Sequence, residues 1–171
     1  TALPISISIQ DTIKEGELAV SQVTKLGTSS LTVAAGATLS GEKATLTNSS
    51  VIINGNVSPG STAISSTGVI SFGDKPVTFN ENSVLIVNAR QCATTTSNGC
   101  NAIGGISKLT FNGTIRIVPS SAHTLQPGDS IRLWDAASMV GTPKFDMQGG
   151  ITWDTSRIAE GLLFVKSVET G

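Results

Sequence analysis

Few residues of this chain have types and spacing that could do chemistry. The two cysteines, Cys92 and Cys100, enclose the polar run Ala-Thr-Thr-Thr-Ser-Asn-Gly. Because such a run forms turns readily, we expect a disulfide that closes a small loop, which would place the chain in an oxidising compartment. The alternative is a pair of unpaired thiols on a loop. A metal site is not expected here, since the only histidine, His123, lies far away in the sequence and there is no second cysteine pair.

Hydrolytic chemistry finds little support in the sequence. There is no Gly-x-Ser-x-Gly turn to present a serine nucleophile, and His123 lies in a polar stretch typical of a surface loop. Paired carboxylates could cleave glycosides. The candidate aspartates all stand in turn-like contexts, where a carboxylate usually binds local backbone: Asp129, Asp135, Asp146 and Asp154. We therefore expect no catalytic residue, no cofactor and no metal.

The two tryptophans are the candidate ligand-binding residues. An exposed indole ring could stack on a sugar, so Trp134 and Trp153 are candidates for ligand stacking. In a strand, Trp134 would share a face with Arg132, and Trp153 would share one with Ile151. Packing in the core or in a cap is the competing interpretation, and the exposure of each ring distinguishes the two.

The composition indicates one all-β domain. Of the 171 residues, 39% are hydrophobic, 13% are charged and 4% are aromatic, with no tyrosine. The net charge of −1 and the absence of a basic run argue against nucleic-acid binding. No apolar stretch approaches the roughly 20 residues of a membrane-spanning helix. The ends at Thr1 and Gly171 suggest one piece of a longer protein.

Short alternating apolar segments recur along the chain, separated by Gly, Asn, Asp, Pro or Ser. Examples are Leu31-Thr32-Val33, Val77-Thr78-Phe79 and Leu109-Thr110-Phe111. The strands are short and lack the aromatic anchors of a sandwich, so we expect a right-handed parallel β-helix with capping strands; a β-sandwich is the alternative. The best helix candidate, residues 11–26, contains Gly16 and many β-branched residues, and is disfavoured.

Several phrases, in their order along the chain, resemble bacterial autotransporter passengers and the autotransporter-associated β-strand repeat. The family phrase L-x-V-x-x-G-A-x-L-x-G is similar to residues 31–41, and N-G-x-V-x-P-G is similar to residues 54–60. Residues 68–87 and 108–115 resemble the phrases that follow. Pro127-Gly128-Asp129-Ser130-Ile131-Arg132-Leu133-Trp134-Asp135-Ala136 resembles a later phrase, G-D-x-x-x-L-x-x-A, and residues 150–165 resemble the repeat as well.

This resemblance implies a β-solenoid displayed outside the cell, attached to the outer membrane through a segment missing here. We expect one solenoid domain over residues 1–171: an N-terminal cap or strands at 1–27, rungs at 28–91, a disulfide loop insert at 92–105, and rungs with a C-terminal cap at 106–171. The expected function is a non-catalytic stalk or adhesin segment whose partners are a host surface protein, a glycan or neighbouring copies. A carbohydrate-binding module is the alternative, and a polysaccharide lyase-like β-helix is a weaker one.

Overall fold

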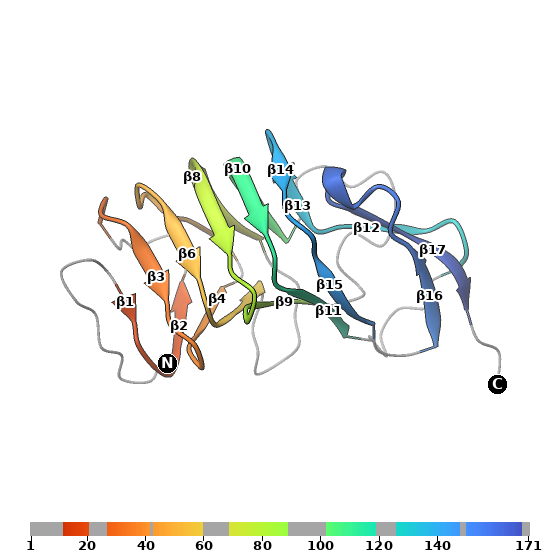
Figure 1. Ribbon diagram of the computed structural model, residues 1–171, viewed down its shortest axis with the longest axis horizontal. Coiled ribbons are helices and arrows are strands. Elements are labelled where there is room, and N and C mark those ends of the chain that lie inside the picture. Colours follow the sequence, from red (N-terminus) through yellow and green to blue (C-terminus); the bar gives the residue numbers. More distant parts are fainter. Residues whose placement is uncertain are drawn as a thin grey trace.

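The computed structural model describes residues 12–20, 27–41, 43–59, 69–88, 102–118, 126–147 and 150–168. Within these ranges the chain is all-β and contains no α-helix; its one helical turn is the 3₁₀ segment η1 (Ile158–Glu160). The disfavoured helix at residues 11–26 is absent from its described part, which forms strands β1 and β2 (Figure 1). Residues 1–11, 21–26 and 92–101, and with them Cys92 and Cys100, lie outside the described residues.

The strands form three sheets. The eight-stranded sheet contains β1 (Thr12–Ile13), β3 (Leu31–Val33), β5 (Lys43–Thr45), β6 (Val51–Ile53), β8 (Val69–Phe79), β10 (Ile103–Phe111), β13 (Trp134–Ala136) and β14 (Met139–Val140). The six-stranded sheet contains β2 (Glu17–Val20), β4 (Thr38–Gly41), β7 (Asn56–Pro59), β9 (Val84–Asn88), β11 (Thr114–Val118) and β15 (Lys144–Met147). The third sheet contains β12 (Ser130–Arg132), β16 (Ile151–Asp154) and β17 (Leu162–Val168).

Every strand pair in the two larger sheets is parallel. The alternative prediction, a β-sandwich, is therefore wrong, because the sheets of a sandwich are antiparallel. The long strands β8 and β10 each pair at two places. Their C-terminal halves continue the ladder of β3 and β6, while the N-terminal half of β8 pairs with β5.

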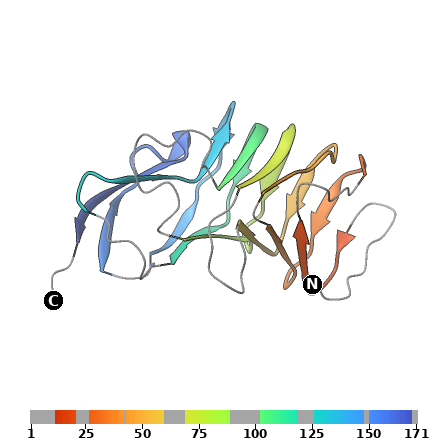
Figure 2. The same cartoon turned by 180° about the vertical axis from the view of Figure 1, so that it is seen from behind.

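The parallel strands therefore form three ladders. Ladder 1 contains β1, β3, β6, the C-terminal halves of β8 and β10, and β14. Ladder 2 is the six-stranded sheet, and ladder 3 contains β5, the N-terminal halves of β8 and β10, and β13. From β3 to β15 the chain runs repeatedly through ladders 1, 2 and 3 in this order, with β12 of the third sheet inserted before β13. Each passage through the three ladders forms one coil, and each coil lies on the one before it (Figures 1 and 2).

Residue alternation explains why these short segments become strands. In ladder 1 the outer residues of each triplet face inward and the middle residue faces outward: Leu31 and Val33 are buried, while Thr32 is half-buried. The parallel register places Thr32 beside Ile52, and Ile52 beside Thr78. β-branched side chains fit such a pleated surface well. The ladder is thus specified by the alternation of inward-facing and outward-facing residues, which repeats in each coil.

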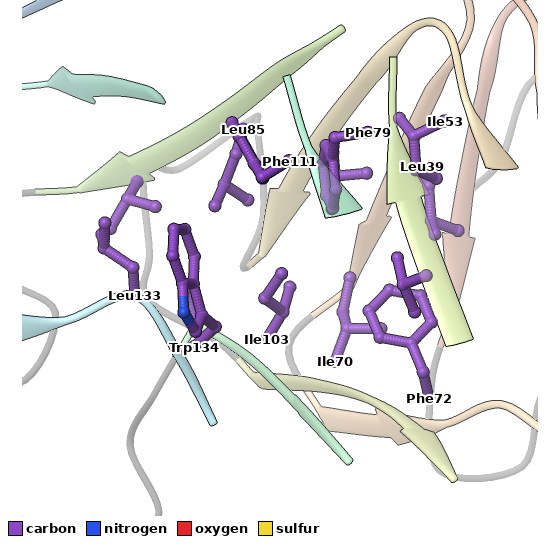
Figure 3. Close-up of a cluster of buried hydrophobic side chains, with 14 of the residues drawn as sticks. Leu39, Ile53, Ile70, Phe72, Phe79, Leu85, Ile103, Phe111, Leu133 and Trp134 are labelled. Atoms are coloured by element: carbon purple, nitrogen blue, oxygen red, sulfur yellow. The ribbon is translucent and has the colours of Figure 1, made fainter. Parts of the chain in front are cut away.

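The core is a column of apolar side chains between the ladders. Its largest members stack: the rings of Phe79 and Phe111 have centroids 4.6 Å apart, and those of Phe111 and Trp134 are 5.4 Å apart, each pair inclined by 26°. Ile103 and Leu85 are fully buried in the same cluster (Figure 3). Aromatic stacking along the column adds to the burial of apolar surface in joining one coil to the next.

The third sheet is antiparallel and lies at the C-terminal end of the stack (Figure 1). It contributes the buried residues Ile131, Leu163 and Val165 to the core. The expected cap within residues 106–171 includes this sheet, although β15 still belongs to ladder 2. At the other end, β1 and β2 already pair in the register of the ladders. The strand β10 begins at Ile103, so residues 103–105 of the expected 92–105 insert belong to a strand.

Candidate functional site

Both tryptophans lie in the core. Trp134 is 1% exposed and stacks on Phe111, and Trp153 is 8% exposed. Figure 3 shows Trp134 among the buried side chains of the core. Neither indole Nε1 has a hydrogen-bond partner among the residues that the structure describes. The candidate role of Trp134 and Trp153 in ligand stacking is therefore wrong, because neither ring presents a face to solvent. The competing interpretation, packing in the core or cap, describes them correctly.

Three of the four aspartates considered for a carboxylate pair are engaged in other contacts. Asp129 accepts a hydrogen bond from the backbone amide of Gln126 at 2.9 Å, which closes the turn before β12. Asp154 accepts one from the amide of Ser156 at 2.9 Å, and this bond lowers the pKa of the Asp154 carboxyl. Asp146 pairs with Arg116 at 2.9 Å across ladder 2. A lowered pKa keeps a carboxylate ionised, which is the opposite of what a general acid needs.

A second ion pair joins Arg157 to Glu160 in the turn at η1. Two nitrogens of the guanidinium donate to the two carboxylate oxygens at 2.8 and 2.9 Å. These bonds lower the pKa of Glu160 and raise that of Arg157. Arg157 also lies over the ring of Phe164, 5.3 Å from its centroid. The pair is exposed, so we assign it to the local turn and not to a reaction centre. Among the described residues, no group of three His, Cys, Asp or Glu side chains could hold a metal ion.

The corner between ladders 1 and 2 carries stacked asparagines. The Nδ2 group of Asn80 donates to Oδ1 of Asn54 at 2.7 Å, across 26 residues of sequence. One coil further, Oδ1 of Asn112 accepts a hydrogen bond from the backbone amide of Thr142 at 3.1 Å. The three asparagines all follow a ladder 1 strand and donate their backbone amides to Val33, Ile53 and Phe79 in the previous coil. The corner is thus cross-linked from coil to coil.

Removing one of these side chains tests the corner. We expect Asn80→Ala to lower the free energy of unfolding by about 1 kcal/mol, because it removes the amide–amide bond to Asn54. The matched control is Asn82→Ala, two residues later in the same turn, where the exposed side chain makes no such bond. Urea denaturation of both variants measures the difference. Equal stability of the two variants would show that the asparagine contact contributes nothing.

A shallow hollow of about 490 Å³ opens beside this corner. Its lining comes from three consecutive coils: Asn80, Glu81, Asn112, Thr142 and Lys144. The ammonium of Lys144 donates to the backbone oxygens of Glu81 and Asn112, each at 3.2 Å, and so ties the three coils together. All five residues are polar, and the site is open to solvent. Its size falls in the range of small-ligand sites, roughly 300–1,000 Å³.

The sequence alone does not predict this hollow. Its residues lie far apart in the chain and meet only because the ladders bring equivalent corners together. A usable signal is the asparagine that directly follows three of the apolar triplets, in Ile53-Asn54, Phe79-Asn80 and Phe111-Asn112. In contrast, Cys92, Cys100 and His123 lie outside the described residues, so the expected disulfide stays a prediction.

Comparison with known proteins gives no relative for this chain. No protein-family model, no curated protein and no solved structure matches it. Among the described residues, no helix has the length and apolar character needed to cross a membrane.

Proposed function

We propose that this chain is a segment of a parallel β-helix that acts as a non-catalytic structural and adhesive module on the cell surface, similar to autotransporter passengers. The observation that carries the proposal is the repeated order of the three ladders, with each coil hydrogen-bonded in parallel to the next. Stacked coils pair the backbone groups of every inner strand, which makes a stiff body with a long side surface.

The corners and the outer faces support the same proposal. Corner bonds such as Asn80–Asn54 and the Lys144 contacts hold neighbouring coils in register without charge clusters. The outward column of ladder 1 consists of β-branched side chains: Thr12, Thr32, Ile52, Thr78, Thr110 and Val140. An uncharged face of this kind suits contact with a host surface protein, a glycan or a neighbouring copy. We place the module outside the cell, joined to the outer membrane by a segment beyond this chain.

The charged side chains do not favour the lyase alternative. A lyase that abstracts a proton from an acidic polysaccharide needs a free basic residue near a group that neutralises the substrate carboxylate. Three of the described basic side chains, Arg116, Arg157 and Lys144, are instead used in contacts that join strands or turns. We therefore assign the exposed surface to binding and not to turnover.

An adhesion assay tests this proposed function. Beads coated with the purified domain should attach to cultured epithelial cells several times more often than beads coated with serum albumin. The soluble domain, added in excess, should abolish the attachment. Attachment no better than that of albumin beads would overturn the adhesive role. Release of unsaturated products from polygalacturonate by the purified domain would overturn the non-catalytic assignment and favour a lyase.

A further inference from the structure

The hollow beside the asparagine corner has polar groups left over from its structural contacts. Asn80 uses its Nδ2 group on Asn54, which leaves its Oδ1 without a hydrogen bond to the described residues. Asn112 accepts a hydrogen bond from the backbone amide of Thr142 through its Oδ1, which leaves its Nδ2 without a hydrogen bond to the described residues. The hydroxyl of Thr142 and the carboxylate of Glu81 also bind no described residue. Thus some polar groups of the corner form hydrogen bonds between coils, and the remaining ones are available to a ligand in the hollow.

These groups alternate between donor and acceptor. The amide oxygen of Asn80 and the carboxylate of Glu81 accept, the amide nitrogen of Asn112 donates, and the hydroxyl of Thr142 does both. Lys144 donates two of its three ammonium protons to backbone oxygens and keeps one for the hollow. Neighbouring hydroxyl groups of a sugar each donate and accept a hydrogen bond, so they match a mixed set of this kind. The aliphatic stems of Glu81 and Lys144 offer C–H surface to a sugar ring.

The charged side chains of the hollow favour neutral sugars over anionic ones. Glu81 and Lys144 carry opposite formal charges, so the hollow is neutral as a whole. The ammonium is already held by two backbone oxygens, while the carboxylate is not, so an anionic sugar would meet the freer negative charge. We propose that this hollow is a binding site for a neutral hexose unit of a glycan. The inference rests on the proposed adhesive function and assigns it a site and a ligand class.

Affinity at such a site is modest. None of the described residues that line the hollow is aromatic, so we count no stacking and expect a dissociation constant of about 1 mM for a free oligosaccharide. An adhesive surface with many copies of the module would gain strength from simultaneous binding. A weak, exposed and polar site is therefore compatible with firm attachment of cells.

Side-chain amide signals of Asn80 and Asn112 in ¹⁵N NMR spectra provide the test. Maltotriose, cellotriose, mannotriose and N-acetylchitotriose are titrated into the domain, with trigalacturonate as the anionic comparison. We expect at least one neutral trisaccharide to shift these signals saturably, and trigalacturonate to leave them unchanged. Glu81→Gln and Thr142→Ala should each weaken binding by about tenfold. Asn82→Ala, next to the hollow but outside its lining, should bind as the parent does.

Three results would overturn the inference: no shift of the corner amides with any neutral trisaccharide, binding that both Glu81→Gln and Thr142→Ala leave unchanged, or stronger binding of trigalacturonate. The bead assay separates this inference from the proposed function. Beads that attach equally well with Thr142→Ala refute the sugar site and keep the adhesive role. Sugar binding without attachment of beads refutes the adhesive role and keeps the site.

Discussion

Replacing Phe111 by alanine is expected to lower the free energy of unfolding by about 3–5 kcal/mol, a large part of the stability of a domain of this size. Phe111 is fully buried and stands between Phe79 and Trp134 in the aromatic stack. The substitution removes both ring contacts at once and leaves a cavity between two coils. Urea denaturation followed by circular dichroism measures the loss.

A second phenylalanine provides the control. Phe145 occupies the position beside Ile115 in the register of ladder 2, but its side chain is 37% exposed. We expect Phe145→Ala to cost less than half as much as Phe111→Ala, because less apolar surface leaves the core and no ring stack is broken. Equal costs for the two variants would contradict the assignment of Phe111 to the centre of the core.

Gly161→Ala is the second substitution with a large expected effect, of about 3 kcal/mol or more. Gly161 ends η1 with φ of +79°, a left-handed conformation that costs a residue with a Cβ atom roughly 1–2 kcal/mol. A Cβ atom there would also press against the backbone oxygen of Trp134, and would lie 2.8 Å from Cδ1 of its indole ring. The added Cβ atom cannot move away, because the backbone of Trp134 and its fully buried indole ring both lie next to it.

Gly36→Ala separates the cost of the left-handed backbone conformation from the cost of the steric clash with Trp134. Gly36 has nearly the same conformation, with φ of +84°, yet a Cβ atom there would meet nothing within 4 Å. This variant should lose only the conformational part, about 1 kcal/mol. Thermal unfolding of both variants gives the difference, which measures the close approach of Gly161 to Trp134. If the two variants were equally stable, the C-terminal turn would not be packed against Trp134 as described.

Much of the fold could be predicted from the sequence because the ladders depend on local patterns. Triplets such as Leu31-Thr32-Val33 alternate, and glycine or asparagine follows them at the corners. Two features could not be predicted. The long strands β8 and β10 each serve two ladders, since Gly73 and Gly105, both with positive φ, bend them instead of ending them. The antiparallel pairing of β16 with β17 depends on contacts at the end of the stack, which no local pattern encodes.

The candidate site was less predictable than the fold. Trp134 and Trp153 are candidates by residue type, because indoles bind sugars, but residue type alone does not determine exposure. In this chain Trp134 aligns with Ile103 in ladder 3, a fully buried position. The hollow depends on the parallel register, which brings Asn80, Asn112 and Thr142 to one corner from three coils. Coil lengths vary, with stacked corner partners 26 residues apart in one case and 30 in another, so sequence spacing could not align them.

The stacked parallel register underlies both the proposed module and the corner hollow, and one distance tests this register most directly. Spin labels are attached at Thr32→Cys and Val140→Cys, with Cys92→Ser and Cys100→Ser removing the native thiols. Both positions face outward on ladder 1, linked in register through Ile52, Thr78 and Thr110. Parallel strands about 4.8 Å apart place their Cα atoms about 19 Å from one another. Pulsed electron paramagnetic resonance should give one narrow distribution consistent with this separation. A broad distribution, or one centred at twice the distance, would contradict the stack and with it the proposed module.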